Sequence, residues 1–227
     1  MKIISDPLLQ IRVRQDGYVD NGSNRGFQKG TKNKYNNYYS VWSLKTNRLY
    51  SVHRIIGAAF VPKFSQDFNV VDHIDGGIGN HSSNLRWITQ RLNMINQKSA
   101  RNITFNKLRN KWAAAQRVFG KMQHLGYFEK EEEAFEIAMA FRELTFFCIF
   151  MSHLTTKEDA IGAKARGCCY IHGTRASFDL AVELLDSRVR GSRVLRQKVS
   201  KLYCLLPAFT WTSETDDEIR HPSFVSK

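Results

Sequence analysis

The sequence is short of the features that mark several classes of protein. It has four cysteines and four prolines in 227 residues. The cysteines form no CxxC pair and no spaced ligand set, which argues against a structural zinc site or a disulfide framework and favours a reducing compartment. The most apolar run, residues 144–151, is much shorter than the roughly 20 residues that cross a bilayer. With no signal-peptide pattern either, we expect a soluble, intracellular protein without a membrane partner.

Acidic residues are missing from the middle of the chain. No Asp or Glu lies between Asp75 and Glu129, whereas lysines and arginines recur throughout that stretch, and the whole chain has a formal net charge of +13. A solvated face usually carries charges of both signs. The imbalance therefore indicates a polyanion as partner, and we expect double-stranded DNA.

We expect an α+β protein with four regions. The first alternates apolar and polar residues as short antiparallel strands do, and the second has the order strand, loop, strand, helix. The third predicts a three-stranded meander followed by a helix over 131–147. The fourth is expected to be mostly helical, and its role is open. These regions cover residues 1–62, 63–99, 100–150 and 151–227.

A pattern in the second region predicts hydrolysis of a phosphodiester. Asp72 and His73 close an apolar strand, two glycines turn the chain, and asparagines follow at Asn84 and Asn93. Such hydrolysis needs a base to deprotonate water and a Lewis acid to stabilise the leaving oxygen. An ordinary imidazole titrates near neutral pH, and carboxylate and amide oxygens suit a hard divalent ion. Neighbouring residues on a strand point to opposite sides, so the strand must end or twist here to serve one site.

This conjunction resembles the HNH family of ββα-metal endonucleases, and most of all its phage and intron-encoded homing branch. The resemblance rests on Asp-His-Ile-Asp-Gly from Asp72, on Asn-Leu-Arg-Trp-Ile-Thr from Asn84, on Asn93, and on Val-His-Arg-Ile-Ile-Gly-Ala-Ala-Phe from Val52. It covers about residues 50–97. The resemblance implies a ββα-metal core.

The resemblance also implies a role for each matching residue. His73 would be the general base, and Asn84 would pin the loop by hydrogen bonds to backbone so that His73 is oriented. Asp72 and Asn93 would hold one Mg²⁺ or Mn²⁺ ion per active site. No small-molecule cofactor is expected.

The loop after His73 departs from the family pattern. It is one residue shorter than usual, Gly77 stands where Asn is common, and Asn80 is the candidate to compensate. His53 heads an apolar helix and is interpreted as structural or phosphate-facing rather than as a ligand. His81 is interpreted as a loop residue near DNA rather than as a catalyst.

The third region resembles the Apetala-type DNA-binding domain, which is known from plant transcription factors and occurs appended to HNH homing nucleases. The resemblance rests on Lys-Trp-Ala-Ala-Ala-Gln-Arg, His-Leu-Gly-Tyr-Phe and Glu-Glu-Glu-Ala within residues 102–144. It implies a three-stranded sheet, backed by a helix, that enters the major groove. Strand alternation places Trp112 in the core rather than against a base. The predicted DNA contacts are Lys107, Arg109, Lys111, Arg117 and His124, with Arg86 from the second region.

These patterns predict a site-specific DNA endonuclease of the HNH homing type, which uses one divalent metal ion and a histidine base. Two alternatives stay open: a non-catalytic, sequence-specific DNA-binding protein or regulator that retains the HNH fold, and an RNA-processing nuclease. Cys168 and Cys169 near His172 are interpreted as small residues of a loop rather than as metal ligands. The target sequence, the number of strands cut and the oligomeric state are not indicated.

Overall fold

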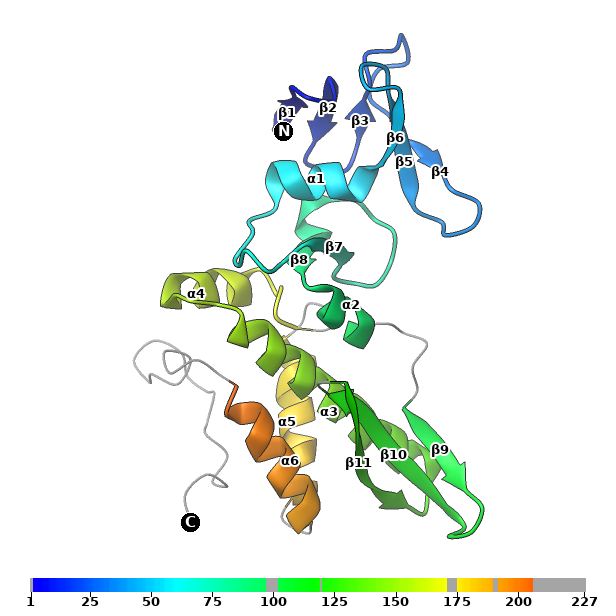
Figure 1. Ribbon diagram of the computed structural model, residues 1–227, viewed down its shortest axis with the longest axis vertical. Coiled ribbons are helices and arrows are strands. Elements are labelled where there is room, and N and C mark those ends of the chain that lie inside the picture. Colours follow the sequence, from blue (N-terminus) through cyan, green and yellow to red (C-terminus); the bar gives the residue numbers. More distant parts are fainter. Residues whose placement is uncertain (1, 97–101, 119, 171–174, 190–191, 206–227) are drawn as a thin grey trace. The chain divides into compact units, whose positions relative to one another are not determined.

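The computed structural model describes residues 2–96, 102–118, 120–170, 175–189 and 192–205 (Figure 1). It is an α+β protein with small antiparallel sheets and six α-helices in those residues, as the sequence predicts. The chain forms two compact units, divided between Asn93 and Met94. None of the described helices combines the length and apolar composition that a membrane span requires.

The first unit begins with two three-stranded antiparallel sheets, of order β1-β2-β3 and β4-β5-β6. Short strands joined by tight turns are what the alternating sequence predicts. Their bounds are β1 Ile3–Asp6, β2 Ile11–Arg14, β3 Val19–Asp20, β4 Thr31–Lys32, β5 Tyr39–Ser43 and β6 Arg48–Ser51.

A hairpin and helix α1 complete the first unit, and helix α2 spans the division between the two units. Strand β7 pairs antiparallel with β8, and the 3-10 turn η1 lies between them. The order strand, loop, strand, helix expected for this region is observed. The bounds are α1 Val52–Phe60, β7 Val70–His73, η1 Ser82–Asn84, β8 Leu85–Ile88 and α2 Gln90–Asn96.

Helix α1 lies close against the hairpin. A Cβ atom on Gly57 would lie 2.7 Å from Val71 Cγ2, so only glycine permits this approach. The indole of Trp87 donates to the carbonyl oxygens of Gly57 and Val61, at 3.3 and 3.2 Å. A single apolar core joins β2, β3, β5, α1, β7 and β8 through Ile11, Val13, Val19, Val41, Val52, Ile55, Ile56, Val61, Val71 and Leu85. The N-terminal strands and the hairpin therefore support each other.

The second unit contains an antiparallel sheet of order β11-β10-β9 with α3 packed on one face. Its strands are β9 Ile103–Asn106, β10 Lys111–Val118 and β11 Lys121–Phe128. Helix α3, Glu131–Ser152, begins where predicted but ends later than residue 147, because buried apolar residues continue to Met151. Helices α5 and α6 pack on α3. The remaining bounds are α4 Lys157–Ala165, α5 Arg175–Val189 and α6 Arg193–Tyr203.

Candidate active site

His73 ends strand β7 and is enclosed by side chains from three other segments. Only 3% of the residue is exposed. Its ring stacks on Tyr38, with centroids 5.5 Å apart and planes within 9°, and lies 5.2 Å from the ring of His53. Its Nε2 lies 3.0 Å from Asn80 Oδ1. In the tautomer with the proton on Nε2, Asn80 accepts this hydrogen bond and Nδ1 is the basic nitrogen.

Asn84 ties together the two ends of the loop that follows His73. Its Oδ1 accepts from the backbone N–H of Asp75 at 3.2 Å, and its Nδ2 donates to Asp75 Oδ1 at 3.0 Å and to the Gly79 carbonyl at 2.9 Å. Its backbone carbonyl accepts from Ile74 at 2.8 Å. Asn84 therefore bonds to the backbone at both ends of the loop, whereas the amide that touches His73 belongs to Asn80.

The turn between β2 and β3 holds the same loop from the other side. The backbone N–H of Ser82 donates to the Gln15 carbonyl at 2.9 Å. Gly17 has φ +93°, and a Cβ there would lie 2.8 Å from the backbone carbon of Asn80. A side chain at position 17 would therefore be strained and would also displace the segment that carries Asn80.

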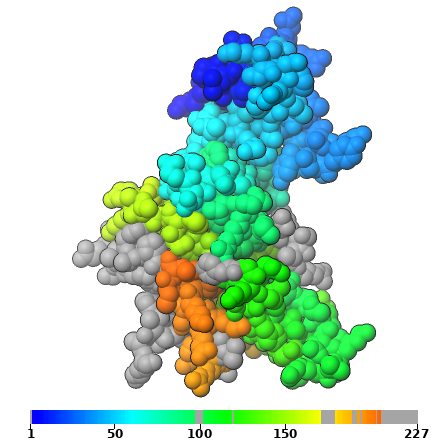
Figure 2. Space-filling view, in the orientation of Figure 1, coloured from blue at the N-terminus to red at the C-terminus, as the bar shows by residue number. Residues whose placement is uncertain are grey.

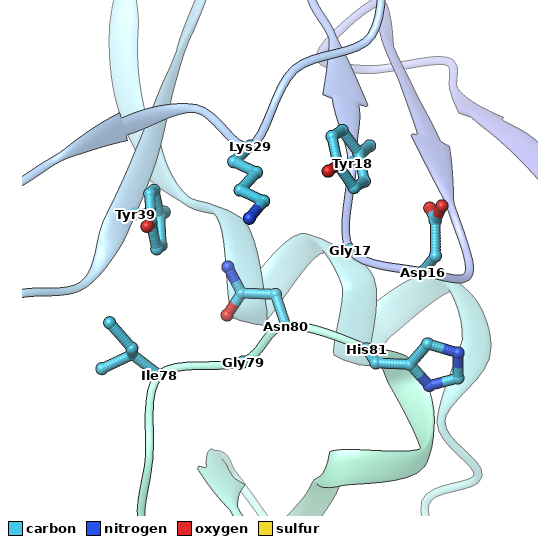
Figure 3. Close-up of a pocket in the computed structure, with 9 residues that line it drawn as sticks. All are labelled: Asp16, Gly17, Tyr18, Lys29, Tyr39, Ile78, Gly79, Asn80 and His81. Carbon is cyan, nitrogen blue, oxygen red and sulfur yellow. The ribbon is translucent and has the colours of Figure 1, made fainter.

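A pocket of about 390 Å³ lies between this turn and the loop. Tyr18, Lys29 and Tyr39 line one side of it, and residues 78–81 line the other. In Figure 3 the ammonium of Lys29 and the amide of Asn80 point toward each other across the pocket, while the ring of His81 points away. Asn80 thus connects the pocket with His73.

His53 is a neutral neighbour of His73. Its pKa is lowered to about 4, first by burial and then by the positive charges that His73 and Arg54 can carry. Its Nδ1 is buried and has no hydrogen-bond partner among the described residues. The proximity of Tyr38, His53 and His73 was not predicted from the sequence. The available signal was that His53 heads a helix whose apolar face must cover the strand ending at His73.

Asp72 pairs across the hairpin with Arg86, which lies directly opposite in the register. Arg86 donates from Nε at 3.0 Å, and its second nitrogen lies 2.9 Å from the same oxygen, Asp72 Oδ2. The side chain of Arg86 is fully buried and that of Asp72 is 11% exposed. Because its side chain is fully buried, Arg86 is not accessible to an external ligand, although the sequence predicted a DNA contact for it. Strand alternation alone would point Asp72 and His73 to opposite faces, but β7 ends at His73, as it must for the two residues to serve one site.

Asn93 lies on α2, one turn after the end of β8. The residue is half-buried, and its backbone N–H donates to the Thr89 carbonyl at 3.0 Å. Among the described residues there is no group of three or more His, Cys, Asp and Glu side chains arranged to hold a metal ion. Cys168 and Cys169 are buried, while His172 lies outside the described residues.

The sheet of the second unit has one covered and one open face. Ala114, Gln116 and Val118 of β10 are buried on the α3 side, whereas Arg117 on the other side is exposed. Trp112 is half-buried and makes an edge contact with Phe105, 5.3 Å between centroids.

The predicted contact residues of this unit lie at the open face and its turns. Arg109 lies 4.7 Å over the ring of Tyr127, which in turn lies 4.5 Å from the ring of His124. Lys111 pairs with Glu129 at 2.7 Å, and Lys107 is exposed. The open face therefore carries basic side chains next to aromatic rings.

Comparison with known proteins finds similarity to one kind of enzyme. No family model matches the chain. It is 32% identical over 106 residues to the DNA endonuclease I-HmuI of Bacillus phage SP01, a match that covers 46% of this chain and 50% of that protein. A solved structure described as DNA binding and cleavage by the HNH homing endonuclease I-HmuI is 26% identical, with a TM-score of 0.38 over 48% of this chain and 65% of that one. The chain thus spans about half the length of the curated relative it matches.

Proposed function

We propose that this protein is a DNA endonuclease of the HNH homing type. Its similarity in sequence to a DNA endonuclease supports a nuclease. The observation that carries the mechanism is the position of His73. It ends a hairpin strand directly after Asp72, and its Nε2 lies 3.0 Å from an amide oxygen of the following loop.

In this proposal His73 is the general base. Nδ1 takes a proton from the attacking water, while Asn80 accepts the hydrogen bond from Nε2 and so keeps the tautomer. Asn84 maintains the loop through its bonds to Asp75 and Gly79. Asn80 and Asn84 act through His73, so both are positioning residues.

Asp72 and Asn93 would hold one Mg²⁺ or Mn²⁺ ion in a ββα-metal arrangement. Their carboxylate and amide oxygens fit such an ion, because Mg²⁺ is commonly bound through one or two protein carboxylates and keeps several waters and phosphate oxygens as its other ligands. The bound metal would stabilise negative charge on the leaving oxygen. The buried Arg86 fixes one oxygen of Asp72, and we give it this role in place of the DNA contact.

The open face of the β9–β11 sheet would contact duplex DNA in the manner of an Apetala-type domain. Arg117 is exposed on β10, where a guanidinium in the major groove can bond a guanine in bidentate fashion. Lys107, Arg109 and Lys111 would contact phosphates, and the ring of His124 lies on the same face.

The experiment is cleavage of supercoiled plasmid that carries the DNA flanking this gene, with Mg²⁺ or with EDTA at fixed low salt. Low salt is needed because affinity for DNA falls steeply as salt rises. Duplex DNA, single-stranded DNA and RNA of the same sequence are compared. Metal-dependent cutting of the duplex alone supports the proposal, whereas cutting of RNA alone would replace it with an RNA-processing nuclease.

A second candidate is a DNA-binding protein that does not cleave. The observation that favours it is the burial of His73, which is 3% exposed and stacked on Tyr38. A base must meet water, so cleavage requires this ring to become accessible when substrate binds. Binding to duplex DNA without nicking in any metal would establish the second candidate.

A further inference from the structure

Helix α6 is a basic amphipathic helix for which the sequence predicts no catalytic or metal-binding role. It contains no acidic residue between Arg193 and Tyr203. Leu195, Val199 and Leu202 are buried at helical spacing and attach it to the second unit. Its basic side chains lie off this buried stripe: Arg193, Arg196, Lys198 and Lys201.

One side of α6 lies against the edge of the β9–β11 sheet. Lys198 Nζ donates a hydrogen bond to the backbone carbonyl of His124. Strand β11, which carries His124, is an edge strand of its sheet, and α6 packs beside it. Figure 2 shows α6, in orange, at the surface next to the green residues of the sheet. Lys201 lies one turn after Lys198, on the same side of the helix.

Positive charges converge where α6 meets β11. The pKa of His124 is lowered by burial and then by the charges of Lys198 and Arg109, and the pKa of Lys198 is lowered by burial and then by the charge of Lys201. Within the described part of the chain, none of Arg109, Lys198 and Lys201 forms an ion pair with a carboxylate. Like charges gathered without a counter-charge repel each other, and an anionic partner would relieve that repulsion.

We propose that α6 extends the DNA-contact surface beyond the edge of the sheet, with Lys198 and Lys201 bound to phosphates of the same duplex that the sheet contacts. This inference rests on the proposed function, because it assumes that the open face of β9–β11 meets DNA. Lysines act as point charges on phosphates, so α6 adds affinity and register without sequence preference.

The test is the salt dependence of duplex DNA binding by the full chain. Each phosphate contact removed from B-DNA lowers the slope of log affinity against log salt by about 0.9. We expect Lys198→Gln and Lys201→Gln each to lower the slope by about 0.9, and the double variant to lower it by about 1.8, equally for every sequence. The matched control is Lys157→Gln/Lys164→Gln on α4, which removes the same charge from the same unit and should leave the slope unchanged.

Two further variants separate the possible failures. Lys198→Arg keeps the charge and should keep the slope. If Lys198→Arg lowers the slope as much as Lys198→Gln does, the lysine only supports β11 and the proposal is overturned. The side chain of Lys201 makes no hydrogen bond with any residue that the structure describes, so Lys201→Gln is not expected to disturb the fold. If Arg117→Ala weakens binding while Lys201→Gln leaves the slope unchanged, α6 is excluded and the proposed function survives. If the wild type shows no salt-dependent binding, both proposals fail.

Discussion

The imidazole of His73 is fixed by one hydrogen bond and two ring contacts, and each comes from a different part of the first unit. Asn80 holds Nε2, while Tyr38 and His53 limit rotation of the ring. A base that is already oriented loses less freedom when it takes a proton from water. Removing one of these neighbours should therefore change the cleavage rate separately from the affinity for DNA.

Asn80→Ala removes the acceptor at Nε2. We expect the rate of cleavage at saturating protein to fall by roughly 10- to 100-fold, as when other partners that orient a functional histidine are lost. Affinity for DNA should not change. Asn80→Asp keeps an acceptor oxygen and should recover part of the rate. Cleavage by Asn80→Ala at the wild-type rate would show that this hydrogen bond has no role.

His53 should make the fold sensitive to mild acid. In the folded state its pKa is about 4, below its ordinary value of 6.5, so the unfolded chain takes up a proton first as pH falls. Stability is therefore lost between about pH 6.5 and pH 4, relative to a His53→Phe variant that does not titrate. Urea denaturation of both proteins from pH 7.5 to pH 4 measures the difference. A constant difference in unfolding free energy between the two proteins over this pH range would contradict the lowered pKa of His53.

At the level of elements, the turn between β2 and β3 supports the loop of the candidate active site. Gly17→Ala should destabilise the protein by roughly 1 kcal/mol through its positive φ, and it should also slow cleavage by displacing Asn80. The matched control is Gly22→Ala, at φ +80°, where an added Cβ meets nothing within 4 Å. The control should share the loss of stability and keep the cleavage rate. Equal cleavage by the two variants would show that the turn does not support the loop.

Much of the local structure was predictable because it depends on neighbours in the chain. The third region forms the predicted three-stranded meander, and α3 starts at residue 131 as predicted, with three acidic residues in its first turn. The fourth region was expected to be mostly helical, but the bounds of α4 were not predictable because this helix is short and weakly amphipathic. Its clearest signal is Thr156, whose side chain caps the helix by accepting a hydrogen bond from the backbone N–H of Asp159. Strands of two residues, such as β3, lack enough alternation to be recognised.

The candidate site was only partly predictable. Asp72 and His73 are adjacent in the chain, and Asn84 closes the loop between two strands, so these positions follow from local pattern. The contacts of Tyr38 and His53 with His73 depend on tertiary packing. The burial of Arg86 depends on the strand register, which places Asp72 opposite it.

At the scale of the whole molecule, the proposed function assigns cleavage to the first of the two units and DNA contact to the β9–β11 sheet of the second. Arg117→Ala tests the DNA-contact half. We expect discrimination at one base position to fall by about 1–3 kcal/mol, with smaller losses for other sequences. Binding to a set of duplexes that differ at single positions measures this change. A uniform loss across the set would make Arg117 a phosphate contact instead.

Whether His73 is the base of a DNA-cleaving site is best decided by nicking of supercoiled plasmid in Mg²⁺ by wild type, His73→Ala and His81→Asn. His81 lies in the same loop, and Asn keeps an acceptor for the Ser83 N–H that His81 caps. We predict that His73→Ala binds DNA normally without cutting, while His81→Asn cuts like the wild type. Cutting by His73→Ala at the wild-type rate would show that His73 is not the base.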